Sequence, residues 1–82
     1  MDYFLFDLVF ESADAMMRKL YKKHLEGYRD WDKPTIEMQN NLIHSLQTNL
    51  NKGDYVDVMI ISAMLNYRKF HKISAKTRNH NP

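Results

Sequence analysis

The acidic residues that could hold a metal ion are Asp54 and Asp57, three positions apart at the expected start of a helix. Two carboxylates on one helical turn can share a hard cation such as Mg²⁺, which takes one or two carboxylates together with water and phosphate. The same spacing is typical of helix capping, with Asp54 as the N-cap and Asp57 in the first turn. On a helical wheel Asp57 falls on the apolar side, so we expect it to need a lysine, an arginine or a metal ion as partner.

A second group of candidate residues mixes cations with aromatic rings near the end of the first predicted helix. Aromatic rings can stack on a base and cations can hold phosphates, whereas Trp31 could instead cover the helix ends as a core residue. His44 lies roughly 100° from the centre of the apolar face of the second predicted helix. The candidate ligand-binding residues are therefore Lys22, Lys23, Tyr28, Arg29, Trp31 and His44.

Amide side chains occupy the core side of the second predicted helix. Gln39 and Gln47 lie there, and Asn40 lies at its margin. A metal-dependent hydrolase would need carboxylates at such positions, but the only acid of this helix, Glu37, points away from them. Buried amides typically join helices by hydrogen bonds, so we expect structural roles for them.

The first of the elements that must position these residues is a long helix over residues 3–25. Apolar residues recur there at intervals of three and four, and neither Gly nor Pro interrupts the pattern. Asp2 is the predicted N-cap, and acids precede cations along the helix, as the helix dipole favours. Gly27 is expected to end the helix in the left-handed conformation.

A helical hairpin is predicted to follow. Pro34 suits the first turn of a second helix over residues 34–51, with Asp32 or Lys33 as its N-cap. The run from Lys52 to Asp54 combines a terminating glycine with a new N-cap, so the third helix, residues 55–70 or 55–72, must run antiparallel to the second. The fold class is therefore all-α.

Oligomerisation is expected to complete a helical bundle. The third helix is apolar over most of its circumference, and large apolar residues surround the start of the first helix. Together they would form a larger patch than a monomer normally exposes, and pairing copies around a two-fold axis would cover it. Docking of another protein is the alternative, and a membrane anchor is disfavoured because this apolar segment is acidic. The predicted interface residues are Tyr3, Phe4, Phe6, Phe10, Ile60, Ile61 and Met64.

Composition limits the remaining possibilities. The 82 residues suffice for one domain, expected over residues 1–73, followed by a disordered basic tail over 74–82. The chain contains no Cys, which excludes thiolate metal sites and favours the cytoplasm. The first residues match neither a signal peptide nor a membrane span. The net charge of +2 includes a cluster of cations after Asp57, and nucleic-acid binding would depend on this end alone, so it is not expected.

A series of short motifs runs along residues 16–70: Leu20, Gly27, Trp31, Lys52-Gly53-Asp54-Tyr55-Val56-Asp57-Val58, Ala63-Met64-Leu65 and Arg68. These motifs resemble those of the MazG-like all-α nucleotide pyrophosphohydrolases, most closely their small phage versions. The resemblance implies helical hairpins that dimerise or tetramerise, and Mg²⁺-dependent hydrolysis of nucleoside triphosphates to monophosphates and pyrophosphate.

The metal site of that family combines a Glu-Glu-x-x-Glu run on one helix with a Glu-x-x-Asp pair on the next. The resemblance implies that Asp54 and Asp57 match the pair, with Asp in place of Glu. Neutral or weakly basic side chains stand where the first run is expected, and they cannot offset the charge of a divalent cation. These side chains are Asn40, Asn41, His44 and Gln47.

The function expected from these observations is that of a small, phage-encoded, non-catalytic helical oligomer. It would bind a host protein or a nucleotide-like ligand in the host cytoplasm, and a role in host takeover or anti-defence would fit. One alternative is a Mg²⁺-dependent pyrophosphohydrolase that completes a degenerate site with acids from another subunit. The other is an interaction module that docks through the aromatic start of its first helix.

Overall fold

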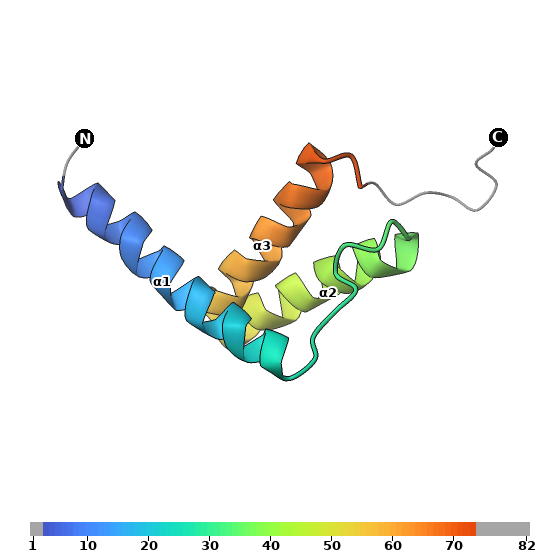
Figure 1. Ribbon diagram of the computed structural model, residues 1–82, viewed down its shortest axis with the longest axis horizontal. Helices are drawn as coiled ribbons and strands as arrows, with labels where there is room; N and C mark the ends of the chain where they lie inside the picture. The colour runs from blue at the N-terminus through green and yellow to red at the C-terminus, as the bar shows by residue number, and fades with distance from the viewer. Residues whose placement is uncertain (1–2, 74–82) are drawn as a thin grey trace.

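The computed structural model describes residues 3–73, which form three helices. They are α1 (Tyr3–Leu25), α2 (Ile36–Lys52) and α3 (Tyr55–Phe70). Figure 1 shows α2 and α3 as a splayed hairpin that runs back on itself, with α1 crossing it near the turn. The predicted all-α fold with a long first helix is confirmed. The predicted N-cap Asp2 and the predicted tail 74–82 lie outside the described residues.

Helix α1 ends as the sequence predicts. Gly27 has a φ of +90°, a left-handed conformation that a residue without Cβ adopts at little cost. The backbone N–H of Tyr28 donates to the carbonyl oxygen of Lys23 at 2.9 Å, and that of Gly27 donates to His24 at 3.0 Å. These two bonds form a Schellman motif, which satisfies carbonyl groups of the last turn.

Helix α2 begins later than predicted, and its N-cap is neither Asp32 nor Lys33. Thr35 is the N-cap, with extended backbone angles (φ −119°, ψ 153°) and a hydroxyl that accepts a hydrogen bond from the N–H of Met38. Threonine supplies the same short oxygen as aspartate for this role. Pro34 therefore precedes the cap instead of standing in the first helical turn.

The turn between α2 and α3 is the predicted one. Gly53 has a φ of +75°, and the N–H of Asp54 donates to the carbonyl oxygen of Asn49 at 2.9 Å. Asp54 then caps α3, because its Oδ1 accepts a hydrogen bond from the N–H of Asp57 at 3.1 Å. The capping role expected of Asp54 is confirmed.

Helix α3 is central, because it packs against both α1 and α2. The buried apolar residues are Leu42 of α2 and Ile60, Ile61 and Met64 of α3. Partly buried side chains from all three helices and the α1–α2 connection complete the core: Met16, Trp31, Met38, Leu46, Val56 and Leu65. The three α3 residues predicted at an interface between copies are thus largely buried within a single chain.

The connection between α1 and α2 is held to α3 by the buried guanidinium of Arg68. Only 1% of Arg68 is exposed. Its Nη1 donates to the carbonyl oxygens of Trp31 at 2.9 Å and Lys33 at 2.6 Å, and its Nε donates to Oε1 of Gln39 at 2.9 Å. All three acceptors are uncharged, and Nη2 has no hydrogen-bond partner. Arg68 thereby fastens the α1–α2 connection to α3.

Candidate functional site

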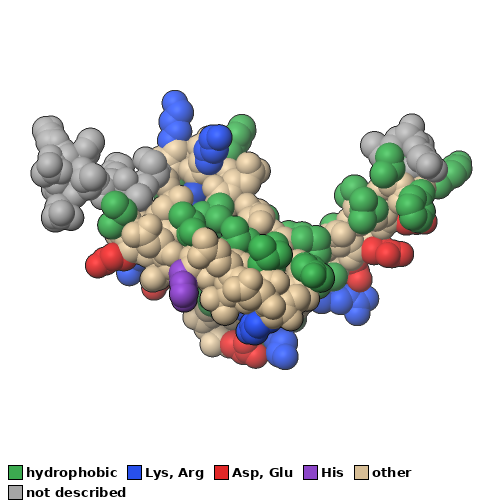
Figure 2. All heavy atoms as spheres, turned by 180° about the vertical axis from the view of Figure 1, so that it is seen from behind, with side chains coloured by type: hydrophobic (Ala, Val, Ile, Leu, Met, Phe, Trp, Pro, Cys, Tyr) green, Lys and Arg blue, Asp and Glu red, His purple; other side chains and the backbone are tan. Residues whose placement is uncertain are grey.

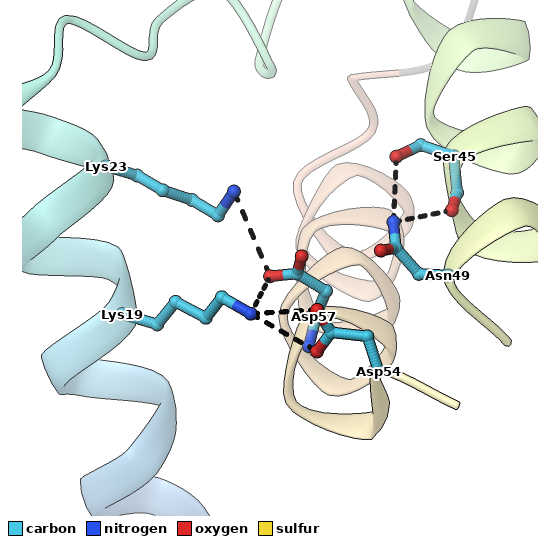
Figure 3. Close-up of polar contacts among 6 residues, drawn as sticks. All are labelled: Lys19, Lys23, Ser45, Asn49, Asp54 and Asp57. Atoms are coloured by element: carbon cyan, nitrogen blue, oxygen red, sulfur yellow. Dashed lines mark hydrogen bonds and ion pairs between the residues drawn. The ribbon is translucent and has the colours of Figure 1, made fainter. Parts of the chain in front are cut away.

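The predicted pair of acids forms an ion cluster with two lysines of α1, as Figure 3 shows. The Lys19 Nζ donates to both carboxylate oxygens of Asp54, at 3.2 and 3.0 Å. It also lies 3.2 Å from Oδ1 of Asp57, while the Lys23 Nζ lies 3.8 Å from the same oxygen. The cluster joins α1 to the beginning of α3 with balanced charge.

Asp57 is the less exposed of the two acids, with 14% of its side chain accessible. Its Oδ1 has no partner with hydrogen-bond geometry, so the two lysines compensate it by charge alone. The expectation that this carboxylate needs a cation from another element is confirmed, and lysines fill the role. A metal ion at this place would have to displace them. Mg²⁺ binding by Asp54 and Asp57 stays a prediction.

Contacts at the cluster shift the pKa values of Asp54, Lys19 and the neighbouring Tyr28. The hydrogen bonds from Lys19 and from the backbone N–H of Asp57 lower the pKa of Asp54. The same carboxylates, Asp54 first, raise the pKa of Lys19. Burial raises the pKa of the neighbouring Tyr28 phenol, and the negative charge of Asp57 raises it further. All of these groups therefore hold their ordinary charge states more firmly at neutral pH.

A small polar pocket adjoins the cluster, with a volume of about 60 Å³. Its polar lining comes from all three helices and the connection: Lys23, Tyr28, Ser45, Asn49 and Asp57. The Asn49 amide nitrogen donates to the Ser45 carbonyl oxygen at 2.9 Å, which holds it on α2 (Figure 3). Ligand sites for small molecules typically measure about 300 Å³ or more. The pocket of a single chain is therefore too small for a nucleotide.

The predicted ligand-binding residues are only partly brought together. Lys23 and Tyr28 meet, with the Lys23 Nζ 5.4 Å from the ring centre of Tyr28, and both line the polar pocket. Arg29 lies beside His24 on the surface, 3.4 Å from its Nδ1. Lys22 is exposed and does not line this pocket.

The remaining two candidates lie elsewhere. Trp31 packs against the core and meets Tyr67 edge to face, with ring centres 5.4 Å apart. This is the alternative role that the sequence allowed for it. His44 is exposed on α2 and does not line the polar pocket.

The amides of α2 differ from expectation. Gln39 is partly buried and bonds to Arg68, as a structural amide should, but Asn40 and Gln47 are exposed. The helix is rotated so that Asn49 is the amide buried near Asp57. Sequence reasoning missed Asn49 and Lys19, because only the crossing of α1 over α3 shows which polar residues meet.

Carboxylates are too few around the cluster for the family-type metal site. Within residues 3–73, no group of three or more His, Cys, Asp or Glu side chains could hold a metal ion. The residues at the positions of the missing glutamates, Asn40, Asn41, His44 and Gln47, are all exposed. What the cluster does in one chain is to fasten α1 to the hairpin.

The largest unexplained feature is the first half of α1, which extends away from the hairpin (Figure 1). We call residues 3–10 the arm. Its large apolar side chains are exposed on every side of the helix, from 41% for Phe6 to 85% for Tyr3. Figure 2 shows hydrophobic side chains gathered along it and continuing across the body. The exposed arm residues are Tyr3, Phe4, Leu5, Phe6, Leu8, Val9 and Phe10.

The comparisons with known proteins leave the family undetermined. The chain matches no protein-family model, no curated protein and no solved structure. Within the described residues, no helix is both long enough and apolar enough to cross a membrane. The resemblance to MazG-like pyrophosphohydrolases accordingly remains a prediction from the motifs.

Proposed function

We propose that the protein is a non-catalytic helical oligomer that acts by binding another protein through the arm. The observation that supports this most strongly is the exposure of seven large apolar side chains on one projecting helical segment. Fully burying one such side chain contributes about 1.5–3 kcal/mol. Leaving all of them in water would forfeit a large part of the stability available to a small domain.

The distribution of these residues around the helix indicates more than one partner. Phe6 and Phe10 lie on one side of α1, with their rings stacked at 6.1 Å between centres. Leu5 and Leu8 lie roughly 100–170° away around the helix. One flat contact covers only one side of a helix. Self-association can therefore cover one side while a different protein covers the other.

The residues on the Leu5 and Leu8 side of α1 indicate which kind of protein would bind there. A shallow hollow of about 270 Å³ on this side is lined by apolar residues, Phe4, Leu5 and Leu8, and by two acids, Asp7 and Glu11. An apolar surface with a basic rim is complementary to this one. The motif resemblance favours a phage-encoded chain that binds a host protein of this kind.

The hydrolase alternative has less support. Lysines already neutralise Asp54 and Asp57, and the pocket beside them measures about 60 Å³. A nucleotide and its Mg²⁺ would need additional acids and space from another subunit. Incubation of the purified chain with nucleoside triphosphates and Mg²⁺ is expected to release no pyrophosphate. Pyrophosphate release that Asp57→Asn abolishes would replace the binding proposal with the hydrolase.

The binding proposal itself is tested by photocrosslinking in expressing cells. A photoreactive amino acid in place of Leu8 is expected to form an adduct with one other protein, and a Leu5→Glu substitution in the same chain should abolish the adduct. The matched control places the photoreactive group at Asn51, an exposed polar residue in the last turn of α2, where no such adduct is expected. Adducts at Leu8 only between copies of the chain would contradict binding of a different protein.

A further inference from the structure

Helix α1 carries an unbroken seam of exposed residues with coiled-coil spacing. The seven positions alternate at intervals of three and four, which is the a/d pattern of a heptad repeat. They are Tyr3, Phe6, Phe10, Ala13, Met17, Leu20 and His24, and every one of them is exposed in the single chain. This seam is distinct from the side of α1 that packs on the hairpin, where Met16, Lys19 and Lys23 point.

We propose that this seam pairs with the same seam of a second copy, with the two α1 helices antiparallel. The charge of α1 selects this orientation. The first half carries Asp7, Glu11 and Asp14, whereas cations begin at Arg18 and continue to the end of the helix. Antiparallel pairing sets each acidic half against a basic half, and parallel pairing would set like charges together.

The heptad positions limit the register to a few choices, and we infer the one that also sets Asp7 and Glu11 opposite cations of the partner. In antiparallel pairs, an a residue of one helix packs beside a d residue of the other. Phe10 then lies beside the partner's Leu20, and Ala13 lies beside the partner's Met17. Arg18, which already bonds Asp14 of its own helix at 2.9 Å, comes near the two-fold axis together with its counterpart. The two Asp14 side chains then lie closest to the axis, and one Arg18 flanks them on each side.

In this register the Phe10 ring of the second copy lies at a groove of the first. The groove has a volume of about 290 Å³ and a mostly apolar lining from α1, α3 and the connection. Leu20 belongs both to the groove and to the seam, so Phe10 of the partner would enter the groove beside it. The lining residues are Leu20, Trp31, Ile60, Ala63, Met64 and Tyr67. The partner copy thus fills a cavity that one chain leaves open.

The pairing rests on the proposed function only in treating α1 as a binding surface. Light scattering on the purified full chain is expected to give twice the 9.9 kDa of one chain. Phe10→Glu should give 9.9 kDa with an unchanged helical circular dichroism spectrum, because Phe10 is 65% exposed and outside the core. The matched control is Leu8→Glu, which introduces the same charge roughly 160° around the same helix and should leave the mass doubled.

Engineered cysteines test the orientation, since the chain has none of its own. An oxidised mixture of Ala13→Cys and Met17→Cys chains should form the mixed disulfide, while either variant alone should not crosslink. Copies of one variant would be offset by about 6 Å along the axis in addition to the interhelical distance of about 8–10 Å. Parallel pairing would give the reverse result, with crosslinks in each variant alone, and would overturn the proposal.

A wild-type mass of 9.9 kDa at high concentration, or dissociation by Leu8→Glu as well as Phe10→Glu, would also overturn the pairing. These outcomes are separable from a failure of the proposed function. A monomeric chain that still gives the Leu8 adduct would refute self-association and leave the binding of another protein standing. A correctly paired dimer that gives no adduct would refute binding of another protein alone.

Discussion

The hairpin of α2 and α3 and the first half of α1 are both rich in apolar residues. The hairpin buries many of these side chains, whereas the first half of α1 leaves them exposed. In the hairpin, Leu42, Ile60, Ile61 and Met64 are buried, and caps hold both ends of α2. In the arm, residues of the same types are exposed on all sides. The hairpin buries its apolar core within one chain, whereas the arm buries none of its large apolar side chains. The difference indicates that the hairpin is a scaffold and the arm is a binding surface.

Removing the buried guanidinium should have the largest effect on the scaffold. Arg68→Ala leaves the carbonyl oxygens of Trp31 and Lys33 without their donor and opens a cavity. We expect the free energy of unfolding to fall by about 3 kcal/mol or more, measured by urea denaturation. Lys69→Ala, an exposed neighbour, should change it by less than about 0.5 kcal/mol. Equal losses of unfolding free energy in the two variants would show that the Arg68 hydrogen bonds do not stabilise the scaffold.

Substitution in the turn should have a smaller effect. Gly53→Ala places a Cβ in open space, but it forces alanine into a φ of +75°. The expected loss is about 1 kcal/mol, because only the backbone conformation is strained. Gly53→Asn should lose less, since asparagine tolerates this conformation. Both are measured by urea denaturation, and no loss with alanine would show that the turn can adopt another form.

The ion cluster should contribute a pH-dependent effect. Lys19→Met keeps the aliphatic stem and removes the cation from Asp54 and Asp57, so the urea midpoint should fall near pH 7. The pKa of Asp54 is lowered in the folded chain, so its contribution is present above the unfolded pKa and is lost as the pH falls through the lowered value. The difference from wild type should therefore shrink in acid. Lys22→Met, at an exposed position, serves as the control, and a difference independent of pH would contradict the ion pair.

The smallest expected effect is on one phenol. Asp57→Asn should lower the pKa of Tyr28, because it removes the second cause of its elevation. Burial is the first cause and remains, so the pKa should stay above its ordinary value. Titration of the assigned Tyr28 ring signals by NMR measures the shift, and Asp7→Asn should produce none. An unchanged Tyr28 pKa in Asp57→Asn would show that the charge of Asp57 does not act on Tyr28.

Local patterns in the sequence were enough to predict the helices and most of their ends. Gly27, Gly53 and the cap Asp54 act through neighbours in the chain, so their roles follow from order alone. Thr35 was missed because Asp32 is an equally suitable cap by residue type, and only the path of the loop decides between them.

The candidate site was less predictable, because it depends on how helices cross. The wheel position of Asp57 correctly required a cation, but nothing local identifies Lys19 as the source. Tertiary packing turns α2 about its axis relative to the predicted orientation. As a result Asn49 is buried and Gln47 is exposed. The packing of α1, α2 and the connection already buries Ile60, Ile61 and Met64 in one chain, which the wheel of α3 alone did not indicate. The large apolar residues of the arm remain exposed.

Hydrogen exchange at two protein concentrations tests most directly whether the arm is a binding surface on a self-contained scaffold. The amides of residues 7–14 are the relevant ones, because the first N–H groups of any helix lack intrahelical acceptors. We predict that their exchange slows as concentration rises, while the exchange of residues 40–48 in α2 stays the same. Equal exchange of residues 7–14 at both concentrations would contradict the account.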